Sequence, residues 1–151
     1  MSMAVQMDRI DRKILDALAK NAHLSMTALG EIVGLSKSPT LSRVRRLERE
    51  GVITGYRADL NLDKLGLSHV AFVQVTLDNT KSDALDAFNA AVLEHAEIEA
   101  AHMIAGGFDY LLKVRTRDIT AYRKTLGETI AALPHVSQTS TFITMETVKE
   151  G

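Results

Sequence analysis

The chain has 151 residues, of which 46% are hydrophobic and 25% charged, with a formal net charge of −1 and neither Cys nor Trp. This length and apolar content predict one ordinary domain or two small ones and exclude a disordered or fibrous protein. The lack of Cys excludes disulfides, thiolate zinc sites, iron–sulfur clusters and cysteine nucleophiles. No apolar run approaches the ~18 residues of a membrane span, and the first residues reach charge too early for a secretory signal, so we expect a cytoplasmic protein that begins near Met1.

The two parts of the chain differ in charge. Residues 1–60 contain 10 Lys/Arg and 7 Asp/Glu, a net charge of +3, whereas the remaining 91 residues contain 8 and 12, a net charge of −4. Opposite signs suggest a module that binds a polyanion, joined to a part that stays away from it.

Three helices are predicted before residue 51. The first begins at Asp8, and the second follows Ser25 as its N-cap and ends at Gly34, a residue suited to positive φ. The third begins with Ser38 as N-cap and Pro39 at the first helical position. Two helices joined by a tight turn, with a preceding helix that closes the core, predict a helix-turn-helix unit.

The third helix is apolar on one side and basic on the other. Leu41, Val44 and Leu47 form an apolar stripe. A helix of this length is ~18 Å long, and the major groove of B-DNA is wide enough to admit it. We therefore expect residues 36–50 to contact double-stranded DNA. The candidate DNA-binding residues are Ser36, Lys37, Ser38, Thr40, Ser42, Arg43, Arg45, Arg46 and Arg49.

These arginines also have an ordinary interpretation. A run of charges is usually a solvated helix face, and Glu48 and Glu50 dilute this one. Arg43 in particular has an equally good structural interpretation, in which its stem packs on the core or its guanidinium pairs with Glu48 or Asp16.

Turn-forming Gly, Asn and Asp residues place a linker at residues 54–67, between domains at 1–53 and 68–151. The second domain is predicted to contain a strand at 69–77, a helix capped by Ser82, strands at 98–105 and 109–116, a helix from Asp118 to Pro134, and a strand at 136–148. The order β-α-β-β-α-β is that of the ferredoxin-like fold, so the whole chain is of the α+β class. One sheet face is left open and rather apolar, and a second copy of the chain about a two-fold axis would cover it.

The stretches DRIDRKILDALAKNAHLSMTALGEIVGLSKSPTLSRVRRLEREGVITGY, HMIAGGFDYLLKVRT and AYRKTLGETIAALPHV resemble the Lrp/AsnC family of bacterial transcriptional regulators over about residues 8–149. The resemblance implies a winged or plain helix-turn-helix domain and a ferredoxin-like domain that binds an amino acid. It also implies dimers that assemble into tetramers, octamers or larger rings.

The resemblance also implies an effector site around the GGFD sequence and the last strand. A free amino acid needs an acceptor for its ammonium and donors for its carboxylate; Asp109 is a candidate for the first and the backbone at Gly106 and Gly107 for the second. Gly107 departs from the family, in which this position is often acidic. The candidate effector-binding residues are His102, Ile104, Gly106, Gly107, Asp109, Tyr110, Thr139 and Thr141.

In the simpler interpretation, Gly106 and Gly107 form a tight hairpin and Asp109 hydrogen-bonds nearby backbone. The five His residues lack the spacing of metal ligands, and no nucleotide-binding or nucleophile motif occurs, so we expect no metal, no cofactor and no enzyme activity. Two other functions stay open. One is a ferredoxin-like enzyme or metabolite-binding module whose helical part mediates assembly, and the other is an architectural DNA-binding protein without an effector.

Overall fold

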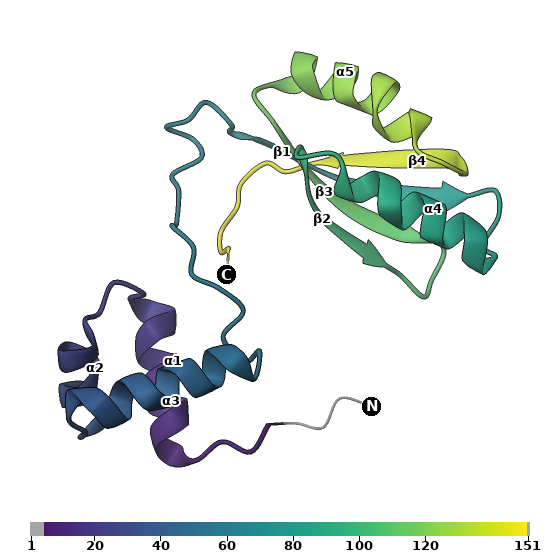
Figure 1. Cartoon of the computed structure of the whole chain (residues 1–151). Helices are drawn as coiled ribbons and strands as arrows, with labels where there is room; N and C mark the ends of the chain where they lie inside the picture. Colours follow the sequence, from purple (N-terminus) through teal and green to yellow (C-terminus); the bar gives the residue numbers. More distant parts are fainter. Residues whose placement is uncertain (1–4, 151) are drawn as a thin grey trace. The chain divides into compact units, whose positions relative to one another are not determined.

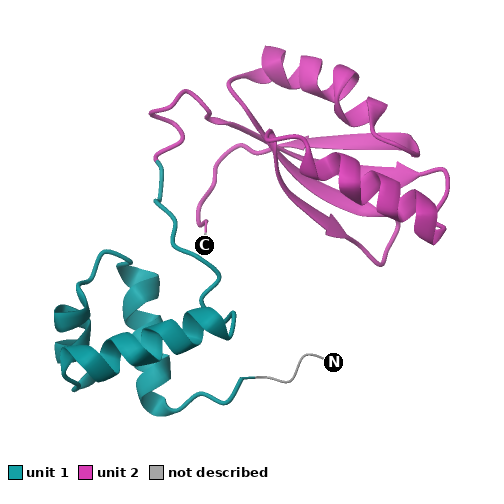
Figure 2. Ribbon diagram, in the orientation of Figure 1, with its two compact units in different colours: residues 1–60 teal, residues 61–151 magenta. Residues whose placement is uncertain are grey.

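The computed structural model describes residues 5–150 and divides the chain into two compact units, residues 1–60 and 61–151 (Figure 2). The boundary falls inside the expected linker of residues 54–67. Each unit is described by itself.

The described residues of unit 1 form three helices and no strand (Figure 1): α1 (Arg9–Lys20), α2 (Met26–Val33) and α3 (Lys37–Arg49). Asp8 caps α1 in a capping box, because its side chain accepts from the backbone N–H of Asp11 while the Asp11 side chain accepts from that of Asp8. Ser25 caps α2 as predicted, and Gly34 ends this helix in the left-handed region at φ 80°.

Helix α3 begins earlier than predicted. Its N-cap is Ser36 rather than Ser38, and Pro39 is the third helical residue rather than the first. Pro39 is tolerated there because the N–H groups of the first turn have no partner within the helix. The buried stripe is Thr40, Val44 and Leu47, whereas Leu41 is only half-buried.

Helices α2 and α3 approach closely at a single glycine. A Cβ atom on Gly30 would lie 2.4 Å from the backbone oxygen of Leu35 and 3.1 Å from Oγ1 of Thr40. Only a residue without a side chain fits at this position, so Gly30 allows the tight turn that precedes α3.

Unit 2 is an antiparallel sheet of four strands with the order β2-β3-β1-β4, and its helices lie against one face (Figure 1). The element order and this strand order are those of the predicted ferredoxin-like fold. Its elements are β1 (His69–Leu77), α4 (Ser82–Leu93), β2 (Ile98–Met103), β3 (Tyr110–Thr116), α5 (Ile119–Glu128), the 3-10 turn η1 (Ile130–Ala132) and β4 (Val136–Ile143).

Several predicted boundaries were wrong. Ser82 is the first residue of α4, and Lys81 is its N-cap. Helix α5 is capped by Asp118 as predicted but ends at Glu128, and a separate 3-10 turn brings Ile130 into the core. Strand β4 ends at Ile143, opposite Ala71 of β1, rather than at residue 148, and the N–H of Thr144 still donates to the oxygen of Val70 at 2.9 Å.

The buried face of the sheet carries Ala71, Val73, Val75 and Leu77 of β1 and packs against Phe88 of α4. On the open face, Phe72 and Phe142 pair across β1 and β4 and are 37% and 53% exposed. Exposed aromatic side chains on a sheet are typical of a surface that another molecule covers.

Candidate nucleic-acid interface and effector loop

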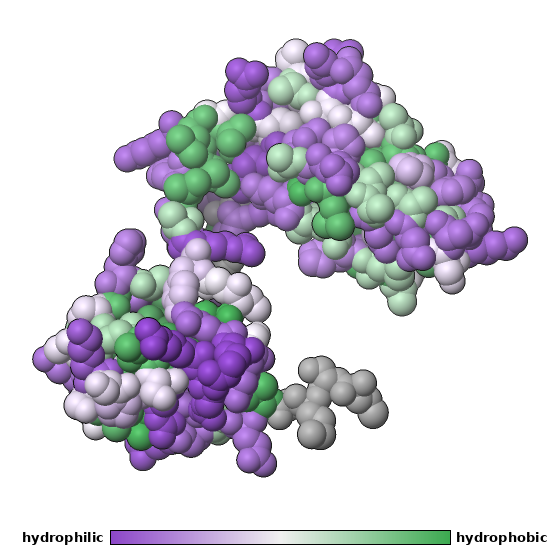
Figure 3. All heavy atoms as spheres, viewed as in Figure 1, coloured by the Kyte–Doolittle hydropathy of each residue, from purple (hydrophilic) through white to green (hydrophobic). Residues whose placement is uncertain are grey.

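Helix α3 presents most of the predicted DNA-binding residues to solvent. Strongly hydrophilic side chains gather over α3 on the face of unit 1 seen in Figure 3. A hollow of about 360 Å³ is lined by Ser38, Leu41, Ser42 and the four arginines of the helix. The exposed members of the predicted set are Ser36, Lys37, Ser38, Ser42, Arg45 and Arg49.

Thr40 does not belong to this surface. Its side chain is completely buried, and its hydroxyl donates to the backbone oxygen of Ser36 at 2.8 Å. The prediction that Thr40 contacts DNA is therefore wrong, because the rotation of the helix places this residue toward α2.

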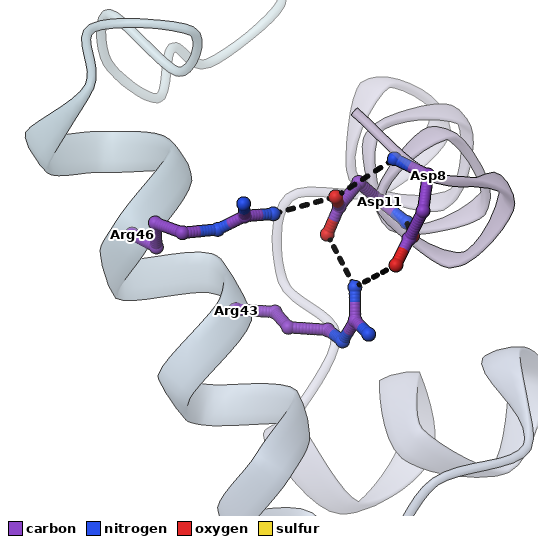
Figure 4. A network of polar contacts seen from close by, with 4 residues as sticks. All are labelled: Asp8, Asp11, Arg43 and Arg46. Atoms are coloured by element: carbon purple, nitrogen blue, oxygen red, sulfur yellow. Dashed lines mark hydrogen bonds and ion pairs between the residues drawn. The ribbon is translucent and has the colours of Figure 1, made fainter. Parts of the chain in front are cut away.

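Arg43 and Arg46 are only half-exposed and reach from α3 to the first turn of α1 (Figure 4). Nη1 of Arg43 lies 2.7 Å from Oδ2 of Asp8 and 2.8 Å from Oδ1 of Asp11. Nη2 of Arg46 lies 2.5 Å from Oδ2 of Asp11. The side chain of Asp11 is 1% exposed, so this carboxylate is buried between the two helices.

The carboxylates and the guanidinium groups of this network stabilise each other's charged forms. Burial raises the pKa of Asp11, but hydrogen bonds from Arg46, the backbone of Asp8 and Arg43 outweigh it and lower the pKa to about 2. The pKa of Asp8 is lowered by the backbone N–H of Asp11 and by Arg43. The pKa values of both arginines are raised by their carboxylate partners.

Sequence reasoning missed both carboxylates as partners of the arginines. It considered Glu48 and Asp16 for Arg43, but Glu48 instead accepts a hydrogen bond of 2.8 Å from the hydroxyl of Tyr56. Burial and this carboxylate raise the pKa of Tyr56 to about 12. Asp8 and Asp11, three residues apart at the start of α1, form a pattern that indicates a helix cap. Their contacts with Arg43 and Arg46 depend on how α1 and α3 cross.

In unit 2, Asp109 lies at the end of the loop between β2 and β3. Its backbone N–H donates to the oxygen of Val75, and its Oδ2 accepts from the backbone N–H of Leu77 at 2.8 Å. The carboxylate is half-buried and holds the loop against the end of β1. The structure thus combines the simpler interpretation, a carboxylate bonded to backbone, with a charged group near the surface.

The glycines and the tyrosine of this region differ from expectation. Gly106 and Gly107 are exposed but do not have positive φ, and a Cβ on Gly107 would meet nothing within 4 Å. The loop spans residues 104–109, so it is longer than the predicted tight turn. Tyr110 is a core residue, with 3% exposure, a ring centroid 4.4 Å from that of Phe88, and a hydroxyl that donates to Asn89.

The remaining predicted effector residues do not gather in one place. Thr139 and Thr141 pair with Val75 and Val73 and so share the helix-covered face, where the hydroxyls of Thr141 and Tyr122 are 2.5 Å apart. His102 pairs with Leu111 on the opposite face. Ile104 is half-buried at the start of the loop, where its N–H donates to the oxygen of Asp109.

Within residues 5–150, no group of three or more His, Asp or Glu side chains is placed to hold a metal ion. In the same part of the chain, none of the helices combines the length and apolar character needed to cross a membrane.

Both units match known families. Residues 7–54 match the family described as winged helix-turn-helix DNA-binding, and residues 70–151 match the Lrp/AsnC ligand binding domain. The described part of unit 1 forms the plain three-helix version, since no strand follows α3 before residue 69.

Relatives match along nearly the whole chain. A proline dehydrogenase transcriptional activator of Rhodobacter capsulatus is 54% identical over 95% of this chain and 93% of its own length. The leucine-responsive regulatory protein of Salmonella typhimurium is 50% identical over 95% and 88%.

Solved structures of transcriptional regulators also match the chain along nearly its whole length. A transcriptional regulator from Neisseria meningitidis in complex with L-Met has a TM-score of 0.90 at 30% identity and covers 96% of this chain and 94% of its own. AsnC of E. coli has a TM-score of 0.88 at 26% identity and covers 97% of both chains. The chain therefore belongs to the Lrp/AsnC family, whose members are transcriptional regulators with a helix-turn-helix DNA-binding domain and a ligand-binding domain, and it is not an enzyme.

Proposed function

We propose that the DNA interface is the solvent-facing side of α3, with Lys37, Arg45 and Arg49 at phosphates and Ser36, Ser38 and Ser42 near base edges. The observation that carries this proposal is the exposure of these six side chains around one helix that a three-helix core holds in place. Serine hydroxyls donate and accept, so they suit base edges, whereas long cations suit phosphates.

Fluorescence anisotropy of a random-sequence duplex tests the DNA interface. We expect the full-length protein to bind with an affinity that falls linearly on a log–log plot against salt concentration. Binding that does not depend on salt would contradict the interface and favour a role of unit 1 in assembly.

We propose further that a free amino acid is the effector and that it binds at the loop of residues 104–109. Two observations support this: the half-buried carboxylate of Asp109 at the loop, and the similarity to a regulator that was solved with L-Met. Asp109 and Thr139 flank Val75 on opposite sides, about two strand spacings or ~10 Å apart, so a small ligand at this sheet end can approach both. Tyr110 and His102 are left out of the proposed site, the first because it is buried and the second because it faces the other way.

The substitution Asp109→Asn tests the ammonium contact. The amide oxygen of Asn still accepts from the N–H of Leu77, so the loop keeps its anchor, but the negative charge is lost. A thermal-shift screen of the amino acids, including proline, leucine and methionine, identifies the effector by the rise in Tm that binding produces. We expect Asp109→Asn to bind that amino acid at least tenfold more weakly and therefore to lose the rise in Tm. Its Tm without ligand and its affinity for DNA should equal those of the wild type.

Alanine at the same position is the control, because it removes both the charge and the anchor and should lower Tm without ligand. A normal response of Asp109→Asn to its amino acid would show that the carboxylate does not hold the ammonium.

The open sheet face supports a homodimer, and we propose that dimers assemble further into tetramers, octamers or larger rings. An effector that binds one assembly better than another shifts the population of assemblies, and with it the spacing of the DNA-binding helices. Such a regulator works in the compartment that holds the DNA, which in bacteria is the cytoplasm. A DNA footprint that changes on addition of the amino acid separates this function from architectural binding, for which the footprint stays the same.

A further inference from the structure

The four arginines of α3 fall into two pairs that differ in what they touch. Arg43 and Arg46 are half-buried and bond to carboxylates of α1. Arg45 and Arg49 are exposed, and no ion pair involves either of them within residues 5–150. Residues four apart lie on the same side of a helix, so Arg45 and Arg49 form a stripe beside the paired one.

The paired stripe carries no net charge. Two guanidinium groups face two carboxylates, and the pKa values of Asp8 and Asp11 are lowered, so both acids are ionised at neutral pH. A neutral cluster releases few counterions when a phosphate approaches. Salt-dependent attraction to DNA must therefore come from charges outside it.

Breaking the ion pairs of this cluster also costs free energy. Asp11 is 1% exposed, and a buried carboxylate that loses its partner is strongly destabilised. If Arg46 turned to a phosphate, Oδ2 of Asp11 would keep only the backbone N–H of Asp8. This cost favours a bound state in which Arg46 stays on α1.

The geometry of the cluster suits a fixed helix orientation. The capping box fixes both acids at the start of α1, and three bonds from two successive turns of α3 end on them (Figure 4). Contacts from two turns restrict both the rotation and the sliding of α3. A helix that contacts base edges in a groove needs a fixed rotation about its axis and a fixed position along it.

We propose that Arg43 and Arg46 are positioning residues, which fix α3 against α1 through Asp11, and that Arg45 and Arg49 supply the phosphate contacts of this helix. This inference rests on the proposed DNA interface. It also narrows the predicted set of DNA-binding residues, which included all four arginines and left a structural role open for Arg43.

The test compares Arg46→Gln with Arg45→Gln in the full-length protein, because the two changes are chemically identical and adjacent on one helix. Binding to a random-sequence duplex is measured by anisotropy over a series of salt concentrations, and Tm is measured in parallel. We expect Arg45→Gln to reduce the slope of log K against log salt by about 0.9 and to leave Tm unchanged. We expect Arg46→Gln to keep the wild-type slope and to lower Tm by about 4 °C or more.

A slope loss in Arg46→Gln equal to that in Arg45→Gln would overturn the inference, since Arg46 would then be a phosphate ligand. The double variant Asp11→Asn/Arg46→Gln keeps the test decisive if the single variant folds poorly, because it removes the unpaired carboxylate. We expect it to regain Tm relative to Arg46→Gln and to keep the wild-type slope, and a reduced slope would again overturn the inference. If the wild-type protein shows no salt-dependent binding, the proposed DNA interface fails instead.

Discussion

At the scale of single residues, unit 1 depends on two positions that are not themselves hydrophobic. Gly30 lets the turn and α3 approach α2, and Asp11 joins α1 to α3 from a buried position. Neither role follows from composition, because both arise where helices cross.

Gly30→Ala should destabilise unit 1 by about 1–3 kcal/mol, because its Cβ would meet the backbone oxygen of Leu35 at 2.4 Å and backbone cannot move aside like a flexible side chain. Thermal or denaturant unfolding measures the loss. Gly127→Ala is the matched control: Gly127 lies in α5 with nothing within 4 Å of its Cβ, so alanine there should be neutral or slightly stabilising. Equal Tm values for Gly30→Ala and the wild type would show that the crossing is looser than described.

Asp11 makes the free energy of unfolding of unit 1 depend on pH in the acidic range. Its folded pKa of about 2 lies below the ordinary value of 3.8, so its contribution is fully present above about pH 4 and is lost as pH falls toward 2. We expect a loss of roughly 2 kcal/mol from this group over that interval. Unfolding of Asp11→Asn measured at both pH values should lack this part of the decline.

Asp16→Asn is the control for this prediction, since Asp16 is exposed on the same helix. A decline in Asp11→Asn as steep as in the wild type would assign the acid sensitivity to other carboxylates.

At the scale of elements, periodicity predicted which segments are helices and strands better than which residues face inward. In α3 the pattern of large apolar residues selected Leu41, but Thr40 is the completely buried residue, and its hydroxyl donates back to the oxygen of Ser36. In β4 the strand was predicted to run to residue 148, but its pairing with β1 ends at Ile143, opposite Ala71. Such limits depend on a partner element, so the segment itself does not contain them.

Prediction of the candidate site had the same limit, since contacts with distant elements are not visible in a local pattern. Residues exposed on one helix, such as Ser42, Arg45 and Arg49, were predicted from the helical wheel alone. The partners of Arg43 and Arg46 lie more than 30 positions away in sequence, so no local pattern indicates them. For the same reason, the opposite faces of His102 and Thr141 became evident only from the sheet register.

At the scale of the whole molecule, the open sheet face predicts self-association. Phe142→Glu places a charge opposite Phe72, and in a dimer formed through this face that charge would be buried, so the association should weaken by at least tenfold. Sedimentation velocity over a range of protein concentrations measures the change. Ile119→Glu is the control, because Ile119 is 51% exposed at the start of α5 and away from this face.

If Phe142→Glu and Ile119→Glu sediment like the wild type at every concentration, the sheet face is not where copies of the chain meet.

The attachment of Tyr56 to Glu48 shortens the free tether between the units. Tyr56 is held on α3, and the next turn closes where the N–H groups of Leu65 and Leu67 donate to the oxygen of Leu62. Residues 57–61 lie between these two anchors, and the six Cα–Cα steps from Tyr56 to Leu62 reach at most ~22 Å. In a dimer, so short a linker gives the second DNA-binding unit a high effective concentration near a duplex that the first unit has already bound. The resulting avidity needs no additional contact.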